Sequence, residues 1–185
     1  MKTAIVFLAD GFEECEALLV VDLLRRAGVQ TIMASVMGRL EVPSSRRILI
    51  KADVLAEDVD YSSADMIVLP GGRVGTENLR KSEVVRSQCL EFAKEGKYLA
   101  AICAAPSILA ELGILDGTRT TCHPDYEERM QGAILTGKSV SVDDKVITGQ
   151  GLGAGFPFAF ELVNALAGQY KVDIIKKAIC YKGSF

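Results

Sequence analysis

Apolar runs and amphipathic segments alternate along the first part of the chain. Short apolar runs at residues 2–8 and 29–37 predict buried strands, because each run ends at a glycine-containing turn. Between them, a helix is predicted from Glu13, with apolar residues at helical spacing and a stop at Gly28. This strand–helix–strand order predicts a parallel sheet.

The alternation continues to the end of the chain. In chain order, the further predicted elements are strands at 48–50 and 65–69, a helix at 82–94, a strand at 99–102, a helix at 106–112, strands at 118–122, 139–142 and 145–148, and helices at 157–167 and 172–181. No internal repeat or linker interrupts this pattern. We therefore expect one α/β domain over residues 1–185, folded as a three-layer sandwich around a mostly parallel sheet.

Composition and charge narrow the class of protein. The 185 residues are 49% hydrophobic and 24% charged, and the net charge of −3 comes without a basic patch, which disfavours nucleic acid as a partner. No apolar run is long enough for a signal segment or a membrane span, so we expect a cytoplasmic protein that does not contact membranes. The five scattered cysteines contain no Cys-x-x-Cys pair, which predicts free thiols and no metal. The first strand–helix turn lacks a dinucleotide fingerprint, so no cofactor is expected.

Cys103 lies at the junction between the strand at 99–102 and the helix that begins near Pro106. Such a strand-to-helix turn, or nucleophile elbow, points the junction side chain out of the end of the sheet. The N-terminus of a helix favours negative charge, so we expect this thiol to ionise more easily than a free one. The alternative is that Cys103 is a small buried residue in a tight turn.

Three carboxyl groups crowd the start of the first helix. Glu13 and Glu14 are interpreted as compensation of the helix dipole on a solvated face. Glu16 differs, because it shares the side of Leu19 and Val20, three and four residues on, which should face the sheet. Burial of that carboxyl would raise its pKa and allow it to carry a proton.

His123 is the only histidine in the chain, and it follows the predicted strand at 118–122. It is the only source of imidazole chemistry within one subunit, although a lone histidine also has structural uses. Cys122 is a rival nucleophile, but neighbours in an extended segment point to opposite sides, so the two should not act as a pair.

Gly71 and Gly72 follow the predicted strand at 65–69. They could form only a tight turn, or the N–H of Gly72 could complete an oxyanion hole with the N–H of Ala104. Parallel sheets bring the carboxyl ends of their strands to one edge, where ligands bind, so these groups should converge with Cys103. The glycines at 151, 153 and 155 are interpreted as close loop packing, since a phosphate loop is only weakly indicated.

Together, these residues resemble the ThiJ/PfpI superfamily, and more closely its DJ-1 branch. The segments that carry the resemblance are ADGFEECE (9–16), VDLLRRAG (21–28), SSR (44–46), VLPGG (68–72), AAICAAP (100–106), TCHP (121–124) and the glycine run before FAFE (158–161). The resemblance implies a flavodoxin-like sandwich that pairs as a homodimer.

The resemblance also implies roles for individual residues. Cys103 would be the reactive, oxidation-sensitive thiol, Glu16 the protonated carboxyl beside it, and His123 the nearby histidine. Gly72 and Ala104 would be the backbone donors.

Two further residues match the family, and two positions differ from its pattern. Arg46 matches an arginine near the pocket, and Asp22 matches an acid near the dimer contact. The peptidase-like branch has histidine directly after the nucleophile, whereas this chain has Ala104, which disfavours a peptidase. The run at 151–153 also lacks the Gly-Pro-Gly common in the DJ-1 branch.

The activity that the resemblance implies is cysteine-dependent chemistry on reactive dicarbonyls. A glutathione-independent glyoxalase would convert methylglyoxal to lactate without a metal, and the same first step would repair early glycation of protein or nucleotide. The alternative is a protein without enzymatic activity, an oxidative-stress sensor or chaperone that acts through oxidation of Cys103.

Overall fold

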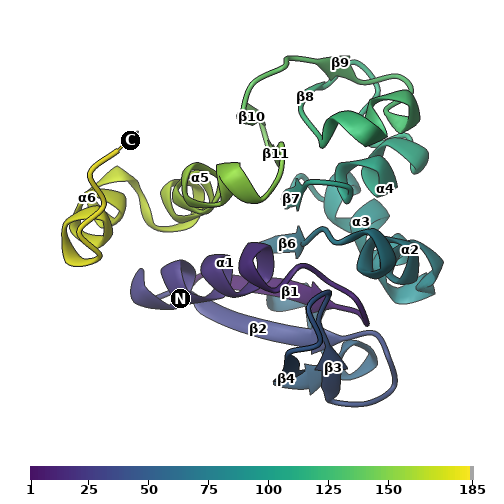
Figure 1. Cartoon of the computed structure of the whole chain (residues 1–185), viewed down its shortest axis with the longest axis horizontal. Coiled ribbons are helices and arrows are strands. Elements are labelled where there is room, and N and C mark those ends of the chain that lie inside the picture. Colours follow the sequence, from purple (N-terminus) through teal and green to yellow (C-terminus); the bar gives the residue numbers. More distant parts are fainter. Residues whose placement is uncertain (184–185) are drawn as a thin grey trace.

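Seven strands form one sheet, and helices cover both of its faces (Figure 1). The computed structural model describes residues 1–183, so the last two positions of the domain expected over 1–185 lie outside it. The order across the sheet is β10-β11-β7-β6-β1-β2-β5, and only the β10–β11 pair is antiparallel. The strands are β1 (Thr3–Leu8), β2 (Gln30–Ser35), β5 (Val54–Leu55), β6 (Met66–Leu69), β7 (Tyr98–Ile102), β10 (Val140–Asp143) and β11 (Val146–Gly149).

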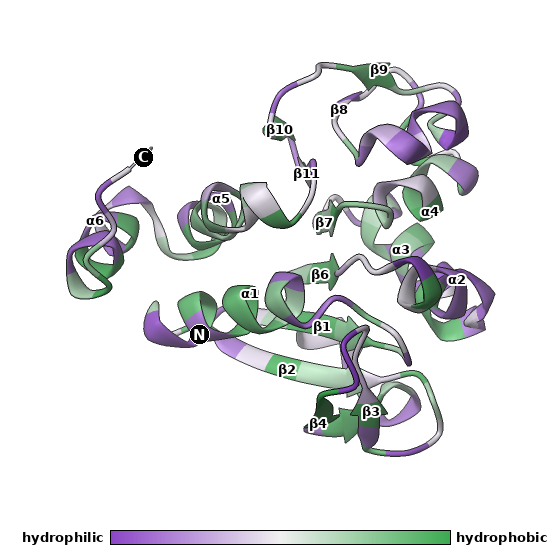
Figure 2. Ribbon diagram, viewed as in Figure 1, coloured by the Kyte–Doolittle hydropathy of each residue, from purple (hydrophilic) through white to green (hydrophobic). Residues whose placement is uncertain are grey.

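The central strands divide the core into two layers, because successive side chains of a strand point to opposite faces. In β1, Val6 and Leu8 belong to the core under α1, α5 and α6, whereas Ile5 and Phe7 belong to the core under α2, α3 and α4. Figure 2 shows the apolar residues along these strands. The helices are α1 (Glu14–Arg26), α2 (Arg73–Lys81), α3 (Glu83–Lys94), α4 (Pro106–Glu111), α5 (Gly155–Ala167) and α6 (Gln169–Ala178).

The strand order confirms the predicted α/β sandwich with a mostly parallel sheet. Without the short edge strands, the order is β2-β1-β6-β7-β11, which is the flavodoxin-like order 2-1-3-4-5. In this topology a crevice opens at the carboxyl ends of the strands, where the connections from β1 and β6 diverge to opposite faces. The chain segments that follow β1, β6 and β7 therefore meet at one edge of the sheet.

Three segments differ from the sequence-based predictions. Helix α2 was not predicted, because its sequence is strongly polar and only Gly75, Thr76 and Leu79 are buried. The run at 118–122 contains only β8 (Arg119–Thr120), which pairs with β9 (Ile134–Leu135) outside the main sheet. The strand predicted at 48–50 is β4 (Leu49–Lys51), which forms a separate antiparallel ribbon with β3 (Glu41–Pro43).

Over residues 1–183, none of the helices combines the length and the apolar character that crossing a membrane requires.

Candidate active site

Cys103 follows the last residue of β7 and takes a left-handed backbone conformation, with φ of 65°. Few residues other than glycine adopt this conformation, and it persists only where neighbouring contacts fix it. Its N–H donates to the carbonyl of Gly149 (2.9 Å), and its carbonyl accepts the N–H of His123 (2.8 Å). The backbone N–H groups of Gly72 and Ala104 donate to its sulfur. The structure therefore has the predicted elbow, with two donors directed at the thiol.

Glu16 lies in the first turns of α1 and points into the protein, where it is 2% exposed. One carboxyl oxygen, Oε2, accepts the N–H of Gly71 at 2.9 Å, and the carboxyl also hydrogen-bonds to Cys103. Burial raises the pKa of Glu16 from 4.5 to about 7, although the N–H of Gly71 opposes the shift. The prediction of an inward-facing carboxyl with a raised pKa is confirmed.

The Cys103 thiol does not have the lowered pKa that its position at a helix start predicts. Burial and the negative charge of Glu16 raise the pKa of Cys103 to about 12, and the N–H groups of Gly72 and Ala104 only partly oppose this. Two negative charges in contact repel each other, so ionisation of one group disfavours ionisation of the other. The thiolate therefore forms more readily while Glu16 is protonated.

Gly71 is the residue that permits Glu16 and Cys103 to meet. A Cβ atom at position 71 would lie 2.5 Å from Glu16 Oε2 and 2.6 Å from Cys103 Cβ, closer than real Cβ contacts. Gly72, the next residue, has φ of 90°, which favours glycine. The two glycines were predicted as a tight turn or a donor, and in the structure they provide both.

The thiol opens into a cleft of about 410 Å³. Cys103 and Glu16 lie at its base, and charged or polar side chains that include Arg46, Arg73 and His123 line its walls. The His123 side chain is 41% exposed, and its Nδ1 accepts the N–H of Asp125 at 3.3 Å. The histidine thus borders the cleft, while its ring hydrogen bond goes to Asp125 instead of Cys103.

Comparisons with known proteins identify the family of this chain. A model of the DJ-1/PfpI family matches residues 2–165. The chain belongs to the DJ-1/PfpI family. Protein dj-1beta of Drosophila melanogaster is 34% identical over 180 residues, which cover 96% of both chains. The glutathione-independent glyoxalase DJR-1.2 of Caenorhabditis elegans is 32% identical over 182 residues, or 97% of this chain and 96% of that one. The solved structure of oxidized DJ-1 from Toxoplasma gondii has a TM-score of 0.94 at 31% identity, and the match covers 98% of this chain and all of that one (100%).

Within this DJ-1/PfpI protein, Asp22 lies away from the cleft. It is an exposed residue on α1, and its carboxylate pairs with Arg26 at 2.7 Å, one helical turn on. The structure thus places Arg46 at the cleft, whereas Asp22 remains a surface residue.

The structure corrects the interpretation of Glu14. It is 5% exposed, not solvated, and it accepts a hydrogen bond from the Ser45 hydroxyl at 2.9 Å. Burial acts to raise the pKa of Glu14, but hydrogen bonds from its own N–H, from Ser44 and Ser45, and from the N–H of Arg46 together lower it. This carboxylate therefore holds the turn that places Arg46 at the cleft, a long-range role that helix position alone did not indicate.

Over residues 1–183, no group of three or more His, Cys, Asp or Glu side chains is arranged to hold a metal ion.

Cys122, the rival thiol, is 1% exposed, and burial raises its pKa to about 11. Its sulfur contacts the carbonyl of His123 at 3.3 Å. Cys103 is thus the thiol that faces the cleft.

Proposed function

We propose that this protein is a cofactor-independent glyoxalase that converts methylglyoxal to lactate in the cytoplasm. The observation that carries the proposal is the hydrogen-bonded pair of Glu16 and Cys103 at the base of an open cleft. The pair combines a nucleophilic sulfur with a carboxyl whose pKa of about 7 lets it both take and give a proton near neutral pH. The relative named as a glutathione-independent glyoxalase supports this activity.

In the first step, the proton of the pair resides on Glu16, and the Cys103 thiolate attacks the aldehyde carbon of methylglyoxal. A carbon–sulfur bond forms, and the carbonyl oxygen becomes an alkoxide. Before this attack, the N–H groups of Gly72 and Ala104, which point at the sulfur, stabilise the negative charge of the thiolate. The alkoxide takes the proton of Glu16 to give a hemithioacetal, which leaves Glu16 as a carboxylate.

In the second step, Glu16 moves a proton between the two carbons. The Glu16 carboxylate removes the proton from the carbon bonded to sulfur, which gives an enediolate, and a proton returns from Glu16 to the neighbouring carbon. The hydroxyl proton moves from the first oxygen to the second in the same rearrangement. The product is a thioester of lactate on Cys103. Water cleaves the carbon–sulfur bond and releases lactate and the free thiol, so the net reaction consumes one methylglyoxal and one water.

Proton transfer by Glu16 has an isotopic signature. In D₂O, a proton exchanged at the carboxyl gives lactate with deuterium at carbon 2, whereas a direct hydride shift keeps the original hydrogen. We expect deuterium at carbon 2 by proton NMR of the product. Lactate that is fully protonated at carbon 2 would contradict the role of Glu16 as the carrier.

The same thiol could instead act on glycated molecules. An early glycation adduct is a hemiaminal or hemithioacetal of methylglyoxal, so attack by Cys103 on such an adduct leads to the same lactate thioester after the amine or thiol leaves. Release of lactate from a glycated peptide, after free methylglyoxal has been removed by a scavenger, would support this wider substrate range. No release under those conditions would limit the protein to the free dicarbonyl.

A second candidate function is sensing of peroxide. Cys103 is partly exposed, and the N–H groups directed at its sulfur, with the Glu16 carboxyl, are suited to hold an oxygen added to that sulfur. A relative whose solved structure is named as oxidized supports this reading. Mass spectrometry after graded peroxide, combined with the lactate assay, separates the two functions. Selective oxidation at Cys103 with negligible turnover would favour the sensor.

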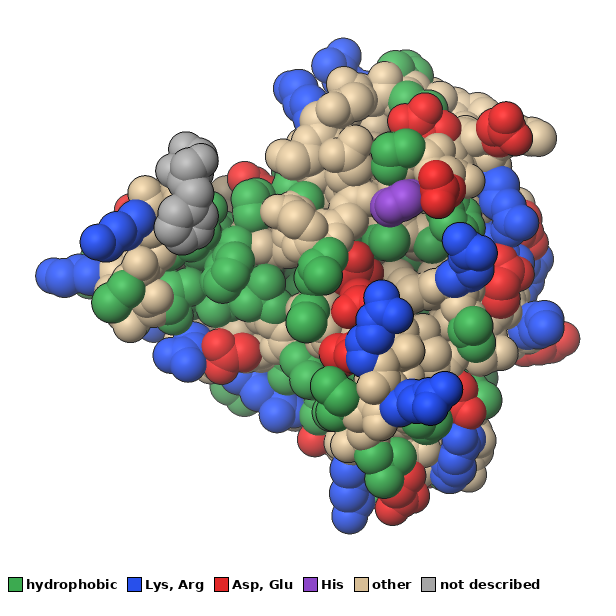
Figure 3. Space-filling view, in the orientation of Figure 1, with side chains coloured by type: hydrophobic (Ala, Val, Ile, Leu, Met, Phe, Trp, Pro, Cys, Tyr) green, Lys and Arg blue, Asp and Glu red, His purple; other side chains and the backbone are tan. Residues whose placement is uncertain are grey.

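Pairing as a homodimer is part of the proposal. Apolar side chains gather on the face over α1 and α5 (Figure 3), and Leu152 and Phe156 are 52% and 39% exposed. Asp22, on the exposed side of α1, is proposed to lie near this contact. Light scattering should give twice the mass of one chain, and Phe156→Glu should reduce it to one chain. A monomeric wild-type protein would contradict the pairing.

A further inference from the structure

The turn that carries Cys103 is held from behind by Ser107, a fully buried residue in the first turn of α4. The Ser107 hydroxyl donates to the carbonyl of Ala104 at 2.6 Å, and its N–H donates to the same oxygen at 3.2 Å. On the other side of Ala104, the carbonyl of Cys103 accepts the N–H of His123. Both peptide units that flank Ala104 are thus fixed. The direction of the Ala104 N–H, which points at the thiol, is fixed with them.

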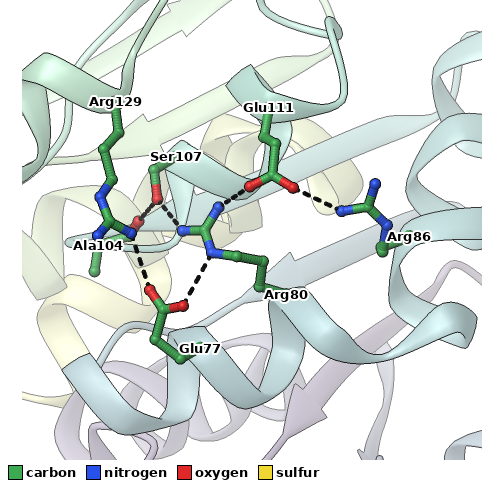
Figure 4. Close-up of polar contacts among 7 residues, drawn as sticks. All are labelled: Glu77, Arg80, Arg86, Ala104, Ser107, Glu111 and Arg129. Carbon is green, nitrogen blue, oxygen red and sulfur yellow. Dashed lines mark hydrogen bonds and ion pairs between the residues drawn. The ribbon is translucent and has the colours of Figure 1, made fainter.

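Arg80, from α2, determines which way the Ser107 hydroxyl points. Its Nη2 donates to Ser107 Oγ at 2.8 Å (Figure 4). A guanidinium has donors only, so the serine oxygen must accept, and the hydroxyl hydrogen is left for the carbonyl of Ala104. Donation from a cation also polarises the hydroxyl and strengthens the bond that it makes onward.

Arg80 is itself held in place by two carboxylates (Figure 4). It pairs with Glu77 of α2 at 3.4 Å and with Glu111 at the end of α4. Each carboxylate has a second arginine, Arg129 for Glu77 at 3.0 Å and Arg86 for Glu111 at 2.9 Å. The Arg80 side chain is only 14% exposed, whereas those of Arg86 and Arg129 are 39% and 57% exposed. Arg80 is therefore the inner member of this network and the one that reaches the elbow.

We propose that Arg80 is a positioning residue for the reaction at Cys103, acting through Ser107 to fix the Ala104 N–H on the thiol. Arg80 does not line the cleft that holds the thiol. The inference rests on the proposed function, because it assumes that Cys103 is the reacting group. The orientation of the Ala104 N–H affects the reactivity of the Cys103 thiol. That reactivity is measurable without any dicarbonyl substrate.

The test is the rate at which iodoacetamide alkylates Cys103 in the full chain as a function of pH, followed by mass spectrometry of the Cys103 peptide. The test variants are Arg80→Met and Ser107→Ala. Arg86→Met is the control for the arginine, because Arg86 also binds Glu111, whereas it is Arg80 that donates to Ser107. Ser87→Ala is the control for the serine. Ser87 likewise donates to a carbonyl three residues earlier, that of Val84 at 3.2 Å, but on the exposed side of α3.

The Ala104 N–H lowers the pKa of Cys103, so a misdirected N–H leaves less thiolate at a given pH. We expect Arg80→Met and Ser107→Ala each to slow alkylation at pH 8 about tenfold, the effect of one pKa unit. Because both act on one bond, the double variant should be no slower than Ser107→Ala alone. Both controls should stay within about twofold of wild type.

Two results would overturn the proposal. One is an unchanged rate in Arg80→Met, and the other is a double variant whose loss is the product of the single losses. Should Arg80→Met fail to fold, Ser107→Ala decides the matter, since it removes a single hydroxyl. Alkylation of Ser107→Ala at the wild-type rate would then overturn the role of the hydroxyl and of the arginine behind it. A lack of glyoxalase activity in the wild type would leave this measurement unaffected.

Discussion

The Glu16 carboxylate accepts the N–H of Gly71, a residue 55 positions further along the chain. This bond joins the first helix to the turn after β6. It holds the carboxyl against the Cys103 side chain, because position 71 has no Cβ. The chemistry proposed for the protein thus depends on a glycine that takes no part in it.

Gly71→Ala should separate the pair. The new methyl group would lie 2.5 Å from Glu16 Oε2 and 2.6 Å from Cys103 Cβ, so one of them must move. We expect destabilisation of about 1–3 kcal/mol from the added atom. Lactate formation should fall by about a hundredfold, the effect of a misplacement near 1 Å.

Thermal unfolding and the lactate assay measure the two effects of Gly71→Ala. Gly153→Ala is the matched control, because a Cβ at position 153 meets no atom within 4 Å. Wild-type turnover in Gly71→Ala would show that the close contact at this position is unimportant.

The raised pKa of Glu16 should make the folded protein less stable as the pH rises. This pKa is raised from 4.5 to about 7, so between these values the folded protein binds more protons than the unfolded chain. The contribution of Glu16 to the free energy of unfolding is full below pH 4.5 and is lost as the pH rises through 7. The free energy of unfolding changes by about 3 kcal/mol over this range. Glu16→Gln has no such group, so the stability of wild type relative to this variant should fall over that window.

Urea unfolding at several pH values measures this difference. Glu14→Gln provides a contrast of opposite sign, because the pKa of Glu14 is lowered and its contribution is lost as the pH falls. A constant difference between wild type and Glu16→Gln from pH 4 to 8 would show that the carboxyl keeps an ordinary pKa in the folded protein.

Removal of the Glu16 charge should also change the thiol. The charge of Glu16 and its hydrogen bond both raise the pKa of Cys103. Glu16→Gln should therefore lower the pKa of Cys103, and alkylation by iodoacetamide near neutral pH should become faster while lactate formation is lost. Slower alkylation in this variant would mean that the carboxyl favours the thiolate.

The positions of Glu16 and Cys103 were predictable, because the local sequence pattern determines where each side chain lies. Helical spacing placed Glu16 toward the sheet, and the strand-to-helix junction placed Cys103 at its edge. The raised pKa of Cys103 was not predictable in this way, because it depends on burial of the thiol and on a carboxylate brought from another element.

Contacts between residues far apart in the sequence account for the other differences between the predicted and the observed site. Glu14 is buried by a turn about thirty residues later, which helix position cannot reveal. Arg80 meets Ser107 across 27 positions, from a polar helix that contains few apolar residues. The alternation of strands and helices, by contrast, is a local property, and it sufficed to predict the three layers.

The most direct test of the account is lactate formation from methylglyoxal without glutathione, by wild type, Cys103→Ser and Glu16→Gln, each shown to be folded by circular dichroism. The account predicts steady production of lactate by the wild type and none above the uncatalysed rate in either variant. Turnover like that of wild type in either folded variant would contradict it.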